Sequence, residues 1–251
     1  MYYYIFEPSQ GPKEYERSAQ IKKQLSELGI AGEMTSPTPG KSVNDLVDLA
    51  IAKRYSTVIA VGSMDLINKV AHAVIPYEVV FGIIPTVDHP DIARLIGTSD
   101  WKQAADHLKR RRFHPVRMGL INDQICFLTP AIIDVPDDVA IELRCPDYMV
   151  SAAGGRMSIT PTFDPEEEAE TLLTVEIEEG TPRRSKGLLG GLFKKKAAAP
   201  GESLLRCPAF DLRSSAPLSV SVAGSVLATT PISCTTQVKP LKLIVGRGGS
   251  S

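Results

Sequence analysis

The first 114 residues alternate short apolar runs with amphipathic stretches. Apolar runs rich in β-branched and aromatic residues occupy positions 2–6, 30–35, 57–61 and 79–84. Apolar residues recur at helical spacing after the turn at 8–12, after Ser42 and after Gly62, and two further helical segments are predicted at 91–95 and 100–111. Strands that alternate with helices are typical of βαβ units, so this part predicts a mainly parallel sheet with right-handed crossovers.

Individual residues support three of these predicted elements. Gly29 follows the first helical segment and is placed to end it in the left-handed conformation. Ser42 precedes the second helical segment with Asp45 three positions later, which predicts an N-terminal cap. Residues 57–61 are all apolar or β-branched, as expected for a strand that is covered on both faces of a parallel sheet.

From residue 115 onward the hydrophobic period changes to two. Alternating runs occur at 118–121, 125–128, 139–143, 172–177, 218–222 and 241–245. This period predicts an antiparallel sandwich or open barrel. The predicted organisation is therefore an α/β domain over 1–114 and a β-rich domain over 115–246. An exposed basic insertion is predicted near 181–201, and a disordered tail over 247–251.

Composition and charge narrow the function classes. The chain has 251 residues, 43% hydrophobic and 23% charged, which is ordinary globular usage. A formal net charge of −1 argues against a globally basic nucleic-acid binder. The four cysteines lack a CxxC spacing, so neither a zinc site nor a disulfide framework is indicated. The start lacks the pattern of a signal peptide and no run is long enough to span a membrane, which predicts a cytoplasmic protein. The sequence indicates no oligomeric state.

The most informative position for function is the turn that follows the strand at 57–61. Ligands of open parallel sheets bind beyond the carboxyl ends of the strands, where a glycine-rich turn and a helix N-terminus can meet a phosphate. Gly62 and Ser63 occupy that place, and Asp65 follows in the first turn of the predicted helix.

Here the sequence resembles the diacylglycerol kinases and related lipid kinases. Residues 61–70 read VGSMDLINKV, where that family has GGDGT followed by IN-E-V; residues 83–97 read IIPTVDHPDIARLIG, where it has P-x-G-T-x-N-D-F-A-R. Residues 7–11, EPSQG, are similar to its N-P-x-S-G phosphate loop, and residues 223–225, AGS, stand where it has D-G-E. The resemblance implies a lipid kinase fold, with Gly11, Gly62, Ser63, Asn68 and Asp91 as nucleotide-binding residues and ATP and Mg²⁺ as cofactors where activity is retained.

The departures from these motifs fall on the residues that carry chemistry. Ser63, Met64, Asp65 and Leu66 replace a glycine, the aspartate, another glycine and the threonine of GGDGT. Val87 and Asp88 replace glycine and threonine in the later motif, which keeps its last aspartate as Asp91; Lys69 reverses a charge, and Ala223 and Ser225 replace an acidic pair. Phosphoryl transfer needs glycines near the phosphates and carboxylates near the acceptor and metal, so the losses predict degraded catalysis.

Three functions remain open. The first is a catalytically degraded lipid kinase homologue, a pseudokinase that binds a nucleotide, a lipid or a protein as a regulatory or scaffolding module. The second is an active ATP-dependent kinase of diacylglycerol or a related lipid hydroxyl that uses Asp65, Asp88 or Asp91 as a displaced carboxylate, with Asp65 as the candidate catalytic residue. The third is a membrane-surface adaptor. Each candidate residue also has a structural interpretation: Gly62 ends a strand, Asp65 and Asp91 begin helices, and Asn68 holds its helix to neighbouring elements.

The basic insertion is the feature that suggests a membrane. Its cationic residues flank an apolar core without any acidic residue: Arg183, Arg184, Lys186, Lys194, Lys195 and Lys196. If the segment coils on a surface, Leu188, Leu192 and Phe193 fall on one helical face, which suggests peripheral contact with the inner membrane surface. The alternative is a solvated loop, because Gly187, Gly190 and Gly191 oppose helix formation.

The membrane hypothesis predicts sedimentation with vesicles rich in phosphatidylserine or phosphatidylglycerol at low salt, and none with neutral vesicles. Each basic side chain near an anionic bilayer contributes about 1 kcal/mol, so Lys194→Glu, Lys195→Glu and Lys196→Glu together should abolish the binding. The melting temperature should stay unchanged. Equal recovery with neutral and anionic vesicles would reduce the segment to a solvated loop.

Overall fold

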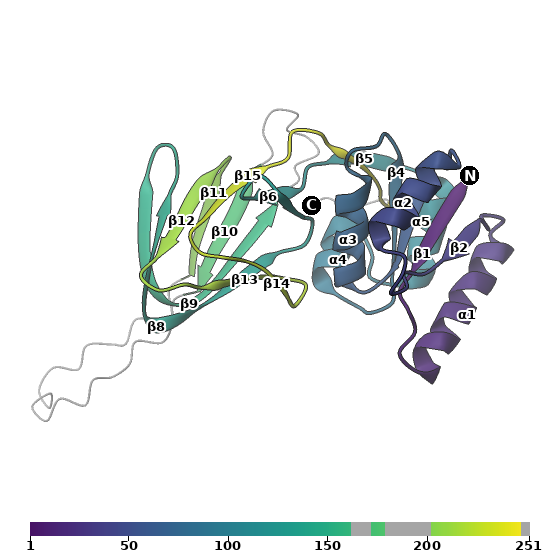
Figure 1. Ribbon diagram of the computed structural model, residues 1–251, viewed down its shortest axis with the longest axis horizontal. Coiled ribbons are helices and arrows are strands. Elements are labelled where there is room, and N and C mark those ends of the chain that lie inside the picture. The colour runs from purple at the N-terminus through teal and green to yellow at the C-terminus, as the bar shows by residue number, and fades with distance from the viewer. Residues whose placement is uncertain (162–171, 179–201, 247–251) are drawn as a thin grey trace, which may run out of the picture.

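The computed structural model describes residues 1–161, 172–178 and 202–246, which form two lobes side by side (Figure 1). The basic insertion, with Leu188, Leu192, Phe193, Lys194, Lys195 and Lys196, lies outside the described residues. The α/β lobe begins with β1 (Tyr2–Phe6), α1 (Pro12–Glu27), β2 (Glu33–Thr35), α2 (Val43–Ala52), β3 (Thr57–Gly62) and α3 (Met64–Val74). It continues with β4 (Val80–Pro85), α4 (Pro90–Ile96), α5 (Trp101–Arg110) and β5 (Phe113–Val116).

The sheet of this lobe has the order β2-β1-β3-β4-β16-β5, and all pairs are parallel except that of β5 with β16. β3 and β4 are buried along their whole length, in agreement with the apolar run that predicts a strand covered on both faces. Helices α2, α3 and α4 pack on one face, whereas Ile21 and Leu25 of α1 and Leu108 of α5 pack on the other.

The second lobe is an antiparallel sheet, as the period of two predicts. Its strands are β6 (Gly119–Ile121), β7 (Ile125–Phe127), β8 (Ala131–Arg144), β9 (Met149–Pro161), β10 (Leu173–Glu178), β11 (Glu202–Cys207), β12 (Phe210–Ser214), β13 (Ser219–Val222), β14 (Ser225–Thr229) and β15 (Ile232–Thr236). The long strand β8 pairs with β9 on one side and with β12 and β13 on the other. Side chains from both ends of the sheet share one core that includes Phe127, Leu143 and Ile159.

One element lies in a different lobe from the one that the sequence indicates. The run at 241–245 is predicted as part of the β-rich domain, yet β16 (Leu241–Ile244) pairs with β4 and β5 inside the α/β sheet. Leu241 and Leu243 are buried while Lys242 is exposed, so the alternating pattern identifies a strand but not its partners. The chain therefore crosses between the lobes twice, and a single boundary at residue 115 does not separate them.

Two local predictions are confirmed. Ser42 and Asp45 form a reciprocal capping box, in which the Asp45 N–H donates to Ser42 Oγ at 3.2 Å and the Ser42 N–H to Asp45 Oδ2 at 2.8 Å. Gly29 adopts a φ of 70° just after α1. Within the described parts of the chain, each helix is too short or too polar to cross a bilayer.

Gly119 is a site where the fold depends on the absence of a side chain. It pairs with Phe127 across β6 and β7, and an added Cβ would overlap the fully buried ring of Phe127. Gly119→Ala is therefore expected to lower the free energy of unfolding by about 1–3 kcal/mol, as overpacking does. Gly40→Ala is the control, since no atom lies within 4 Å of a Cβ there. Equal urea midpoints for the two variants would contradict this packing.

Candidate functional site: the cleft between the lobes

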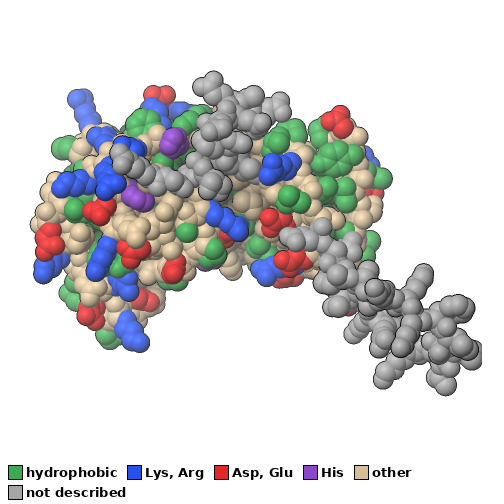
Figure 2. Space-filling view, turned by 180° about the vertical axis from the view of Figure 1, so that it is seen from behind, with side chains coloured by type: hydrophobic (Ala, Val, Ile, Leu, Met, Phe, Trp, Pro, Cys, Tyr) green, Lys and Arg blue, Asp and Glu red, His purple; other side chains and the backbone are tan. Residues whose placement is uncertain are grey.

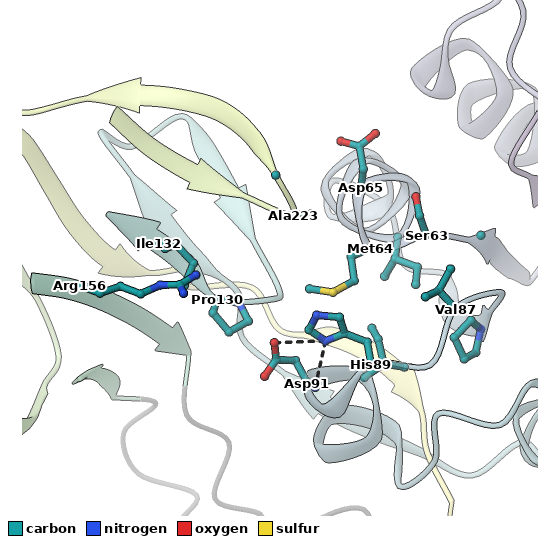
Figure 3. A pocket seen from close by; sticks show the side chains of 15 residues that line it. Ser63, Met64, Asp65, Val87, His89, Asp91, Pro130, Ile132, Arg156 and Ala223 are labelled. Atoms are coloured by element: carbon teal, nitrogen blue, oxygen red, sulfur yellow. Dashed lines mark hydrogen bonds and ion pairs between the residues drawn. The ribbon is translucent and has the colours of Figure 1, made fainter. Parts of the chain in front are cut away.

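A cavity of about 430 Å³ lies between the lobes (Figure 3). The α/β lobe contributes the turn after β3, the first turn of α3, the end of β4 and the start of α4. The β lobe contributes Pro130 and Ile132 near the start of β8, Arg156 on β9, and the turn between β13 and β14. The cavity is thus built by segments that are far apart in the sequence.

Strand register explains why the turn after β3 lies at this cavity. β1, β3 and β4 run parallel, with Phe6 opposite Val61 and Gly62 opposite Pro85, so their carboxyl ends meet at one edge. This is the edge at which α/β sheets bind ligands. Gly62, Ser63 and Asp91 are among the residues that line the cavity.

Glu7, which follows β1 and begins the EPSQG segment, contacts the turn after β3. Ser63 donates its backbone N–H to Glu7 Oε2 and its hydroxyl to Glu7 Oε1, each at 2.6 Å. A Cβ on Gly62 would lie 2.8 Å from Glu7 Cβ, so the carboxylate fills the space beside the glycine. The position of Glu7 in the sequence could have indicated this contact, because Glu7 directly follows a strand that is predicted to share the sheet with the strand before Gly62.

Asp65 lines the cavity, but both of its carboxylate oxygens are engaged. Lys69 lies one helical turn later and approaches Oδ2 at 2.6 Å, and Ser225 Oγ donates to Oδ1 at 3.2 Å. Ser225 follows a turn in which Ala223 and Gly224 both have positive φ, of 52° and 82°. The AGS segment therefore does lie at the site, and it connects the β lobe to α3.

Asn68 does not line the cavity, in contrast to the prediction that it binds nucleotide. Its Nδ2 donates to Met64 O at 2.8 Å and to Thr129 Oγ1 at 2.7 Å, while its Oδ1 accepts from the backbone N–H of Leu128 at 2.8 Å and of Thr129 at 3.3 Å. Asn68 is 7% exposed and Thr129 1%. The amide is thus fully used in joining α3 to the β lobe, which is the structural role that the sequence also allows.

The remaining candidate residues divide between the cavity and the surface. His89 caps α4 by accepting the Asp91 N–H at Nδ1, and the Asp91 carboxylate has Arg94 as an ionic partner at 3.7 Å (Figure 3). Asp88 is exposed and does not line the cavity. Gly11 precedes α1 away from the cavity, so it is not placed to contact a nucleotide there.

The cavity wall is otherwise largely apolar. Met64, Val87 and Ile132 contribute to it, and the side chain of Met64 points into the space between the lobes (Figure 3). Arg156 contributes a guanidinium group to the wall. Asp134 lies 3.8 Å from this group, across the β8–β9 pair. Among the described residues, no group of three or more His, Cys, Asp or Glu side chains could hold a metal ion.

On the face shown in Figure 2, Lys and Arg side chains are frequent over the α/β lobe, where Asp and Glu side chains are interspersed with them. This mixture agrees with the net charge of −1. The polar groups of the cleft are those of the residues that line it.

The clamp made by Asn68 can be tested by truncation. Asn68→Ala leaves the buried N–H groups of Leu128 and Thr129 without their acceptor, and one unpaired buried donor costs about 1–3 kcal/mol. We expect a loss of free energy of unfolding of at least that size in urea denaturation. Asn44→Ala is the matched control, because Asn44 is exposed on α2. A difference of less than 0.5 kcal/mol between the variants, about the scatter of surface substitutions, would contradict the role of the clamp.

The fold was compared with those of known proteins. A scan against protein-family models and a search of the curated proteins both find no match. Among solved structures, one described as a diacylglycerol kinase from Bacillus anthracis str. Sterne matches with a TM-score of 0.70 and 15% identity, covering 98% of this chain and 96% of that one. A second, provisionally described as a diacylglycerol kinase from the same organism, has a TM-score of 0.71 and 14% identity, covering 98% and 97%. The chain therefore has, over nearly its whole length, the two-lobed fold of these diacylglycerol kinase structures.

Proposed function

We propose that the protein is a divergent member of the diacylglycerol and lipid kinase family that has lost phosphotransfer and binds a ligand in the cleft as a regulatory module. Three features support this: the shared fold, the motifs that remain in register, and the cavity at the carboxyl ends of β3 and β4. The proposal places its action in the cytoplasm, and contact of the basic insertion with an anionic membrane stays a separate prediction.

The observation that carries the proposal is the state of the carboxylates. Phosphoryl transfer requires an acid near the acceptor hydroxyl and carboxylates that reach a metal directly or through water. Asp65 is instead bonded to Lys69 and Ser225, so it serves the contact between α3 and the β13–β14 turn. Met64 stands where the family has its motif aspartate, and a thioether neither accepts a proton at neutral pH nor binds Mg²⁺ well.

One observation favours the alternative of an active lipid kinase. Asp65 and Asp91 both line the cavity, so two carboxylates border the space in which a substrate would bind. A nucleotide with Mg²⁺ would have to draw them away from Lys69 and Arg94, respectively. The two functions therefore differ in whether these ion pairs open.

We expect no phosphorylation of diacylglycerol by the purified protein with ATP and Mg²⁺ above a control without protein, because Asp65 and Asp91, the carboxylates that line the cavity in the described part of the chain, are paired with Lys69 and Arg94. The measurement is transfer of labelled γ-phosphate to lipid in mixed micelles. Turnover that disappears in Asp65→Ala but survives in Asp48→Ala would overturn the proposal. Asp48, on the neighbouring helix α2, is a suitable control because its carboxylate also accepts a hydrogen bond, from the Tyr77 hydroxyl at 2.6 Å.

A further inference from the structure

The N-terminus of α3 already holds an anion that belongs to the chain itself. We propose that Glu7 occupies the position of a ligand phosphate at the turn between β3 and α3 and so restricts the cleft to ligands that carry no phosphate there. The proposal rests on the proposed function, since it describes what the same cleft accepts. It assigns Glu7 as a specificity-determining residue.

The contacts of Glu7 are those that a phosphate would make. One carboxylate oxygen accepts a backbone N–H and the other accepts a hydroxyl, both from Ser63 and both at 2.6 Å. Ser63 is the N-cap residue of α3, but it makes no side-chain cap hydrogen bond of its own because its hydroxyl is directed at Glu7. At an N-cap, a serine hydroxyl ordinarily accepts a backbone N–H of the helix. Here the Ser63 hydroxyl donates to Glu7 instead, so Ser63 gives the carboxylate two hydrogen bonds, one from its backbone and one from its side chain.

The geometry of the strands makes Glu7 a fixed occupant. Its backbone N–H donates to Val61 O at 2.8 Å, which extends the β1–β3 pairing up to the turn. Its Cβ and Oε2 also fill the space beside Gly62, where an added Cβ would lie 2.8 and 2.9 Å from them. A side chain held at both backbone and carboxylate is ordered before any ligand arrives.

Occupation by Glu7 has an electrostatic consequence for ligands. A helix N-terminus attracts an anion through its free N–H groups and its dipole, and here a carboxylate already provides that charge. A phosphate would have to share the donors of Ser63 with Glu7 and would be repelled by it. The neighbouring wall, with Met64, Val87 and Ile132, suits an apolar and non-phosphorylated group instead.

The test measures thermal unfolding of the full chain against rising concentrations of inorganic pyrophosphate. The wild type should show no response. Glu7→Ala should melt lower in buffer, and pyrophosphate should then raise its midpoint by about 2–4 °C in a saturating manner, because the donors of Ser63 become available. Sodium chloride at matched ionic strength should not reproduce the rise.

Glu33→Ala is the matched control for a purely structural carboxylate. Glu33 accepts from Lys53 at 2.7 Å and from Tyr55 at 2.9 Å, so its loss should lower stability without creating a response to pyrophosphate. If Glu7→Ala does not fold, Glu7→Ser also removes the carboxylate from the donors of Ser63, and it should also gain the response. The proposal is overturned if the folded Glu7 variants respond no more than the wild type or Glu33→Ala. Lipid phosphorylation is a separate readout, so failure of the proposed function remains distinguishable from failure of this inference.

Discussion

One buried amide joins the two lobes through four hydrogen bonds. Asn68 uses both its donors and its acceptor oxygen to bind the backbone of α3 and the segment at Leu128 and Thr129. Because a partly satisfied polar group in such a place is costly, the four contacts form together or not at all. The width of the cleft follows from this constraint, since α3 supplies one wall and β8 begins two residues after Thr129.

The carboxylates in and around the cleft are bonded to other groups of the same chain. Glu7 is bound by Ser63, Asp65 by Lys69 and Ser225, and Asp91 has His89 and Arg94 beside it. Partly exposed ion pairs of this kind contribute little to stability individually. Their main effect is on chemistry, because each pair removes a carboxylate from the set that could act on a substrate or hold a cation.

Sequence patterns predicted the elements better than their partners. Helix and strand positions, the cap at Ser42 and the turn at Gly62 follow from local spacing, since they depend on residues close in the chain. The contact partners of Asn68 and Glu7 did not follow from it. Each depends on a contact with a residue about 60 positions away, and a motif aligned by identity gives no information about which group occupies a neighbouring turn.

The return of β16 to the α/β sheet makes the β lobe an insertion within the α/β lobe, and this orders events during synthesis. β16 lies between β4 and β5, and it is the strand with which β5 pairs. Residues 113–116 therefore leave the ribosome well before the strand that completes their sheet. The first lobe has an unfilled edge at β4 until residues 241–244 emerge, whereas the β lobe can form its own sheet in the interval. The inserted lobe is thus the first that can be completed.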